Sequence, residues 1–255
     1  MSLLSSIFGS NDTSSPEFQL LVTRWDNYIS KLKDRYYEVL KQSEAPLNNV
    51  IDNIQFDTVI IHNIKNGLND QTVQQLSKKA DDGWAKMQNE MGKLGVSWNL
   101  ISQQQAKVDE FKNWLAIEFQ KFEVSTYARA ARKIMDNVQK HIDTNKLHKC
   151  TQCAAELPIK IFSFIAINLK CDSCGSVNTY QPDDRIRAME YYVINHLAEE
   201  YAFSAKLKAR GDKNAQKEYY KMYYGYLMEN VPDKKDFYER DMNERINNPM
   251  FSMGF

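Results

Sequence analysis

The sequence is short of the residues that end regular structure, with only nine Gly and six Pro among 255 residues. Breakers this sparse favour long helices with few turns. Neither sign of charge dominates, because 33 Lys and Arg balance 33 Asp and Glu, so no global field draws the chain to nucleic acid or anionic lipid. A composition of 43% apolar and 26% charged residues excludes wholesale disorder and is typical of a folded protein.

Long apolar runs are also missing. The longest, from Ile161 to Leu169, is interrupted by Ser163 and Asn168 and falls short of the roughly 18 to 20 residues of a membrane-spanning helix. The opening MSLLSSIFGSND has no basic stretch before its short apolar part, so we expect no secretory signal and no transmembrane segment. We therefore expect a cytoplasmic protein, in whose reducing compartment cysteines bind metal more often than they form disulfides.

The common catalytic motifs are absent from the sequence: there is no phosphate-binding loop, no G-x-G-x-x-G turn and no G-x-S-x-G elbow. The four histidines are scattered (His62, His141, His148 and His196). His196 stands near Glu199 and Glu200, but di-iron bundles use the reverse order, Glu-x-x-His, in two copies. We interpret this group as a solvated helix face. No catalytic or cofactor-binding residue is predicted, and we expect that the protein is not an enzyme.

Apolar residues recur at helical spacing over most of the chain. Ser15 is a candidate cap for a helix that begins at Pro16. Three heptads follow, which predict a bundle or coiled-coil face (Phe18, Val22, Trp25, Ile29, Leu32, Tyr36 and Val39). We expect this pattern to stop near Ala45–Pro46. The same stripe serves an intramolecular bundle or a homo-oligomer, and the sequence leaves both open.

Three more helices are expected before the cysteines. The second closes at Asn66–Gly67, and Asp70 is a candidate cap for the third, which ends between Gly92 and Gly95. Residues 100–144 contain neither Gly nor Pro and predict one long helix, with a break near residues 124–126 left open.

The only four cysteines form two pairs, Cys150 with Cys153 and Cys171 with Cys174, at the spacing C-x2-C-x17-C-x2-C. A pair two residues apart folds as a tight turn, so that two such turns supply four thiolates to one ion, with Zn–S distances of about 2.3 Å. The intervening LPIKIFSFIAINL has strand composition. Residues 147–182, and no more of the chain, resemble the zinc-ribbon family. The resemblance implies a small β module that holds a structural Zn²⁺.

Other interpretations of the cysteines fit less well. A thioredoxin-like redox site needs one CxxC at a helix start, and a catalytic zinc needs an open position that four thiolates close. His148 is an unnecessary substitute ligand, and iron is the alternative metal at the same four sulfurs. Gly175 supplies the positive φ that such a turn often needs, whereas Ala154 stands at the matching position of the first pair.

Lysine precedes each pair, at Lys149 and Lys170. These cations either contact phosphate or offset the net −2 charge of four thiolates around Zn²⁺, and we favour the second interpretation. The first predicts a nucleic-acid-associated factor with one continuous basic surface (Arg129, Arg132, Lys133, Lys140, Lys146, Lys149 and Lys170).

The C-terminal third predicts helices again. Its many tyrosines favour packing between helices, with a partner-binding face as the alternative. The fold expected is mainly α, divided into a tail at 1–16, a helical bundle at 17–145, a zinc ribbon at 146–182, C-terminal helices at 183–246 and a tail at 247–255. The function expected is that of a zinc-binding interaction or scaffold protein with a protein partner. The apolar tails Ser2–Gly9 and Pro249–Phe255 are candidate docking segments.

Overall fold

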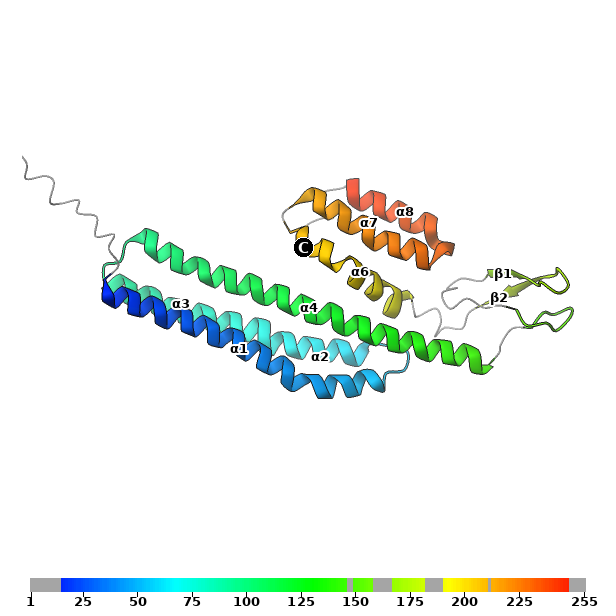
Figure 1. Ribbon diagram of the computed structural model, residues 1–255, viewed down its shortest axis with the longest axis horizontal. Helices are drawn as coiled ribbons and strands as arrows, with labels where there is room; N and C mark the ends of the chain where they lie inside the picture. The colour runs from blue at the N-terminus through cyan, green and yellow to red at the C-terminus, as the bar shows by residue number, and fades with distance from the viewer. Residues whose placement is uncertain (1–14, 146–148, 158–166, 182–189, 211, 248–255) are drawn as a thin grey trace, which may run out of the picture. The chain divides into compact units, whose positions relative to one another are not determined.

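The computed structural model describes residues 15–145, 149–157, 167–181, 190–210 and 212–247 (Figure 1). The fold is mainly α with one small β element, as the sequence predicts. Its elements in chain order are α1 (Pro16–Asp52), α2 (Val59–Asn69), the π-helical turn η1 (Asp70–Gln74), α3 (Gln75–Lys93), α4 (Trp98–Asn145), β1 (Ile167–Lys170), β2 (Val177–Tyr180), the π-helical turn η2 (Glu190–Ile194), α6 (Asn195–Lys208), α7 (Lys213–Asn230), the 3-10 turn η3 (Pro232–Lys234) and α8 (Lys235–Asn247). None of the described helices combines the length and the apolar character needed to cross a lipid bilayer.

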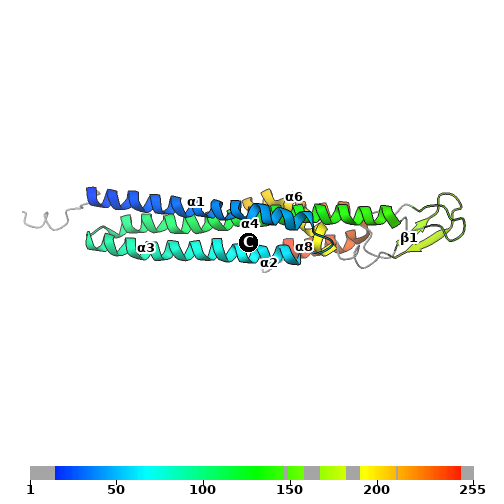
Figure 2. The ribbon, with the colours of Figure 1, turned by 90° about the horizontal axis from the view of Figure 1, so that it is seen from below.

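The chain divides into two compact units, of which unit 1 comprises residues 1–45 and 65–120. Its parts of α1, α3 and α4 lie side by side in both views, with α3 running against the other two (Figures 1 and 2). Trp25 Nε1 donates to the Gln104 carbonyl at 3.4 Å, and Tyr28 Oη donates to the Lys79 carbonyl at 2.9 Å. The heptad stripe predicted for α1 is confirmed: six of its seven members are buried (Phe18, Trp25, Ile29, Leu32, Tyr36 and Val39).

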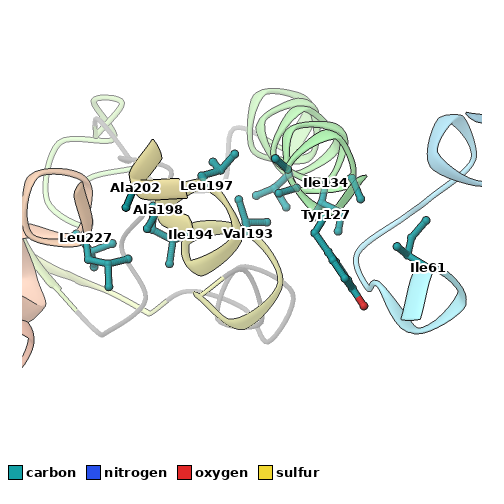
Figure 3. Packing of buried hydrophobic residues seen from close by; sticks show 14 of the residues in the cluster. Ile61, Tyr127, Ile134, Val193, Ile194, Leu197, Ala198, Ala202 and Leu227 are labelled. Carbon is teal, nitrogen blue, oxygen red and sulfur yellow. The ribbon is translucent and has the colours of Figure 1, made fainter. Parts of the chain in front are cut away.

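Unit 2 comprises residues 46–64 and 121–255. Its core draws on α1, α2, α4, α6, α7 and α8. Ile61 comes from α2, Tyr127 and Ile134 from α4, Leu197 from α6 and Leu227 from α7 (Figure 3). Fully buried alanines on α4 and α6 give these helix faces short side chains, which allows the helices to pack closely (Ala128, Ala130, Ala131, Ala198 and Ala202). The predicted packing role of the tyrosines is confirmed for Tyr219, Tyr220 and Tyr224, which are buried in this core.

The predicted helix end at Ala45–Pro46 is wrong, because α1 continues through Pro46 to Asp52. A proline inside a helix removes one backbone hydrogen bond and costs about 3 kcal/mol. Leu47 and Ile51 lie beyond the proline and are buried in the core of unit 2. Their burial offsets the cost of continuing the helix.

The predicted break at Asn66–Gly67 and the cap at Asp70 are also wrong. α2 runs through Gly67 and is followed without a gap by η1, which contains Asp70, and then by α3. Leu68, Thr72 and Leu76 are all buried at steps of four, and Thr72 Oγ1 donates to the Leu68 carbonyl at 2.6 Å. One buried face therefore continues across the π-helical turn. The break left open near residues 124–126 does not occur, since α4 is continuous.

The two units follow other boundaries than the domains expected from the sequence. Unit boundaries fall at Ala45/Pro46 within α1, at Ile64/Lys65 within α2 and at Gln120/Lys121 within α4. The expected boundaries at 145/146 and 182/183 stay a prediction, and the tail segments Ser2–Gly9 and Pro249–Phe255 lie outside the described residues.

Candidate metal centre

The first cysteine pair forms a tight turn closed by two backbone hydrogen bonds. Cys150 N donates to the Ala155 carbonyl at 2.8 Å, and Ala154 N donates to the Cys150 carbonyl at 2.9 Å. Lys149 and Glu156 flank the turn and pair as an isolated antiparallel bridge. The pair is thus carried at the end of a short hairpin.

The second cysteine pair repeats this geometry between β1 and β2. Cys171 N donates to the Ser176 carbonyl at 2.9 Å, and Gly175 N donates to the Cys171 carbonyl at 2.8 Å. The two strands are antiparallel, with Lys170 opposite Val177 at the end next to the turn. The two turns therefore have the same backbone hydrogen bonds, and each holds its two sulfurs in the same way.

The four cysteine sulfurs converge, as the spacing predicts. All lie within 4.8 Å of one another, with 3.5 Å between the sulfurs of Cys150 and Cys174 and 3.6 Å between those of Cys153 and Cys171. These distances exceed a disulfide bond of about 2.05 Å and approach the roughly 3.8 Å edge of a tetrahedron with metal–sulfur bonds of about 2.3 Å. The donor set fits a tetrahedral metal ion, and four sulfurs fill its shell.

Two residues that contact the cysteine sulfurs were not predicted from the sequence. Ser176 Oγ lies 3.0 Å from Cys150 Sγ and 3.1 Å from Cys174 Sγ, and so contacts one sulfur from each turn. Asn178 is buried on β2, accepts from the backbone N of Thr151 at 2.8 Å and donates to Cys150 Sγ at 3.6 Å. Its amide therefore ties the first turn to the second hairpin. In the sequence, the position of Ser176 two residues after a cysteine was the one feature that could have indicated its contact with the sulfurs. Nothing in the sequence indicated the contact made by Asn178.

Hydrogen bonding favours thiolate at two of the sulfurs. The hydrogen bond from Ser176 and the backbone N–H of Cys153 lower the pKa of Cys150 to about 5. Hydrogen bonds from Ser176 also lower the pKa of Cys174. At Cys153 the backbone N–H of Ala155 also favours thiolate, but hydrogen bonding with Cys174 and the other cysteines raises the pKa to about 12. Thiolate is the form that binds metal, so the contacts of Ser176 favour that form at one sulfur of each turn.

The two lysines before the pairs occupy equivalent, exposed positions. Lys149 precedes the first turn and Lys170 ends β1 before the second. Neither forms an ion pair within the part of the chain that the structure describes. Their placement agrees with compensation of a negatively charged metal–thiolate cluster, which stays a prediction.

The two turns differ at one strained residue, and this difference predicts opposite effects of two substitutions. Ala154 has φ of 60° and Gly175 has φ of 75°, and a side chain in this left-handed region costs roughly 1 kcal/mol. We expect Ala154→Gly to tighten zinc binding roughly two- to five-fold and Gly175→Ala to weaken it by a similar factor. Competition with a chromophoric chelator measures both constants. Shifts in the same direction would contradict the assignment of strain to the turns.

The group around His196 is not a solvated face, and the structure corrects that interpretation. Glu199 accepts from Tyr219 Oη at 2.6 Å and pairs with Lys206 at 2.5 Å, with its side chain 20% exposed. The His196 ring stacks on Tyr127 at 4.4 Å between centroids, and burial lowers the His196 pKa. These residues pack the helices of unit 2. The side chains of His141 and His148 lie outside the described residues.

Comparison with family models, curated proteins and solved structures finds no match to this chain. Among the residues that the structure describes, the four cysteines are the one group of three or more His, Cys, Asp or Glu within metal-binding distance. The functional argument therefore starts from this cluster.

Proposed function

We propose that the chain is a non-enzymatic, zinc-binding interaction or scaffold protein, in which a zinc ribbon orients helical protein-binding surfaces. The observation that carries the proposal is the convergence of Cys150, Cys153, Cys171 and Cys174 from two matched turns. Four sulfurs leave no position for a substrate or a water on the ion, which favours a structural role over a catalytic one. Zinc is the metal that such closed four-thiolate shells most commonly hold.

The zinc would act by fixing the course of the chain between two helical elements. In sequence, the four-cysteine module lies between α4 and η2, which both contribute to the core of unit 2. Because a preformed site rarely exists in an unfolded chain, metal binding supplies folding free energy where the module joins the helices. The reducing cytoplasm keeps the thiols available for the metal.

The helical surface supports an interaction role. Large apolar side chains are exposed on both units, among them Trp98 (69%) on α4 of unit 1 and Phe237 (53%) on α8 of unit 2. Aromatic residues are enriched in the centres of protein interfaces. A protein partner is therefore favoured over a nucleic acid.

The nucleic-acid alternative has less support. Arg129 donates to Asn48 Oδ1 at 2.8 Å, and Arg132 pairs with Glu200, so two cations of the predicted basic surface hold other helices of unit 2. This alternative stays a prediction, and the experiment below includes it as an outcome.

The test compares the zinc-loaded full chain with Cys150→Ser/Cys174→Ser as bait in cross-linked native cells, followed by reconstitution from purified components. We expect a defined protein that binds the zinc-loaded chain at least about ten-fold more tightly than the variant. Equal binding to both baits would overturn the role of zinc. Recovery of nucleic acid, with binding that weakens steeply as salt rises, would overturn the protein-scaffold proposal in favour of the alternative.

A further inference from the structure

Unit 1 carries a long groove between α1 and α3. Its volume is about 710 Å³, and its walls run from Leu21 to Arg35 on α1 and from Leu76 to Glu90 on α3. Each wall spans about 21 Å at 1.5 Å per residue, which is close to four helical turns. This length suits a helical segment better than a compact metabolite.

The floor of the groove is apolar, and its shape depends on particular residues. Trp25, Leu76 and Met87 line it and are themselves buried in unit 1. The Tyr28 ring stacks on Trp25 at 5.7 Å between centroids. A Cβ at Gly83 would lie 2.6 Å from the Tyr28 ring, so glycine at this position of α3 allows the ring its place in the wall.

The rim of the groove is strongly basic. Five cations line it (Arg24, Lys31, Arg35, Lys79 and Lys86), against only Asp82 and Glu90. Arg35 pairs with Glu38 and Glu90 pairs with Lys93. The other four cations form no ion pair with any residue that the structure describes. The groove therefore offers unneutralised positive charge on both sides of an apolar floor.

The spacing of the lining residues indicates the shape of the occupant. Residues 21, 24, 28, 31 and 35 of α1, and residues 76, 79, 83, 86 and 90 of α3, follow one another at steps of three and four. Each helix thus presents one continuous face to the groove, on which charged residues of the rim are interspersed with apolar residues of the floor. Two such faces side by side form a surface on which a further amphipathic helix packs.

We propose that this α1–α3 groove binds an acidic amphipathic helix of a partner protein. The helix spans about four turns, lays an apolar stripe on the floor and places Asp or Glu along both edges, opposite the cations of the rim. The chain's own segment Ser2–Gly9 fits less well, because SLLSSIFG contains no acidic residue. The inference rests on the proposed function and names the class of partner.

The test uses a labelled synthetic peptide of about four helical turns, with Leu at the heptad core positions and Glu on both flanks. Fluorescence anisotropy measures its binding to the zinc-loaded full chain. A peptide with Lys in place of every Glu and a scrambled acidic peptide are the probe controls. We expect the acidic helix alone to bind, and its binding to change the emission of Trp25, which lines the groove.

Matched charge reversals locate the site. Lys31→Glu/Lys86→Glu should weaken peptide binding by about ten-fold or more. Lys41→Glu/Lys78→Glu makes the same charge change at exposed residues of α1 and α3 outside the groove, and should leave binding within about two-fold. Equal binding to the two double variants, or equal binding of the Lys peptide, would overturn the proposal.

Other occupants give different results. Tighter peptide binding after deletion of residues 1–14 would show that the tail fills the groove, and a dimer that Lys31→Glu/Lys86→Glu dissociates would show a second copy there. Either result overturns the partner assignment. If a partner captured with the full chain still binds Lys31→Glu/Lys86→Glu, the groove proposal fails and the proposed function stands.

Discussion

The double substitution Cys150→Ser/Cys174→Ser should abolish zinc binding and loosen the four-cysteine module while the helices of unit 1 stay folded. The two residues come from different turns, and their sulfurs lie 3.5 Å apart. Serine at both positions removes one thiolate from each turn, and the remaining sulfurs cannot complete the shell. Structural zinc contributes an apparent free energy of about 10 to 16 kcal/mol in small zinc domains, so this is the largest effect that we expect.

Metal analysis after dialysis should give about one zinc per unsubstituted chain and none for the variant. Ser173→Ala is the matched control, because Ser173 is an exposed residue inside the second CxxC turn, and it should retain the metal. Stoichiometric zinc in the double-serine variant would sink the four-thiolate assignment.

Hydrogen exchange tells whether the loss is local. In the variant, residues 149–157 and 167–181 should exchange faster, because both turns and the β1–β2 pairing converge on the sulfurs. All four tryptophans (Trp25, Trp84, Trp98 and Trp114) belong to unit 1. Their emission should stay unchanged, and a large change would show that unit 1 depends on the metal.

Features decided by neighbouring residues were predicted well. Ser15 accepts from Phe18 N at 3.2 Å, as expected of the cap of α1. The cysteine spacing predicted the convergence of the four sulfurs. A CxxC turn depends on a few consecutive residues, so the sequence contains its whole signal. A cap also needs the chain to leave the helix at that point, which is why the cap predicted at Asp70 failed where the helical backbone continues.

Features decided by packing were missed. Pro46 lies inside α1 and Gly67 inside α2, because buried faces continue across both positions. Ser176 and Asn178 contact the sulfurs because the two hairpins pair. Glu199 contacts Tyr219 because α6 packs on α7. In each case the deciding contact is with a residue distant in sequence, which a local pattern does not reveal.

Unit 2 should lose stability steeply above pH 10, because its buried tyrosines resist ionisation. Burial, reinforced by the charge of Glu199, raises the pKa of Tyr219, and burial with the same carboxylate raises the pKa of Tyr223 to about 12. In the unfolded chain both hydroxyls ionise near pH 10. Their protonated form is favoured in the folded state, so their contribution is fully present below pH 10 and is lost as the pH rises from about 10 toward 12.

The slope of this loss follows from proton linkage. Above pH 10 the unfolded chain binds fewer protons than the folded chain, so the free energy of unfolding falls by about 1.4 kcal/mol per pH unit for each such tyrosine. Tyr219 and Tyr223 together give about 3 kcal/mol per unit up to pH about 12. Urea unfolding followed by circular dichroism at several alkaline pH values measures the slope, while tryptophan emission follows unit 1 separately.

Tyr219→Phe separates this cause from a general effect of alkali. It removes one titrating hydroxyl and leaves Glu199 paired with Lys206, so the slope should fall by about 1.4 kcal/mol per pH unit. Tyr201→Phe, at a tyrosine of α6 that is 57% exposed, is the matched control and should keep the profile of the unsubstituted chain. An unchanged slope in Tyr219→Phe would mean that the alkaline loss arises elsewhere.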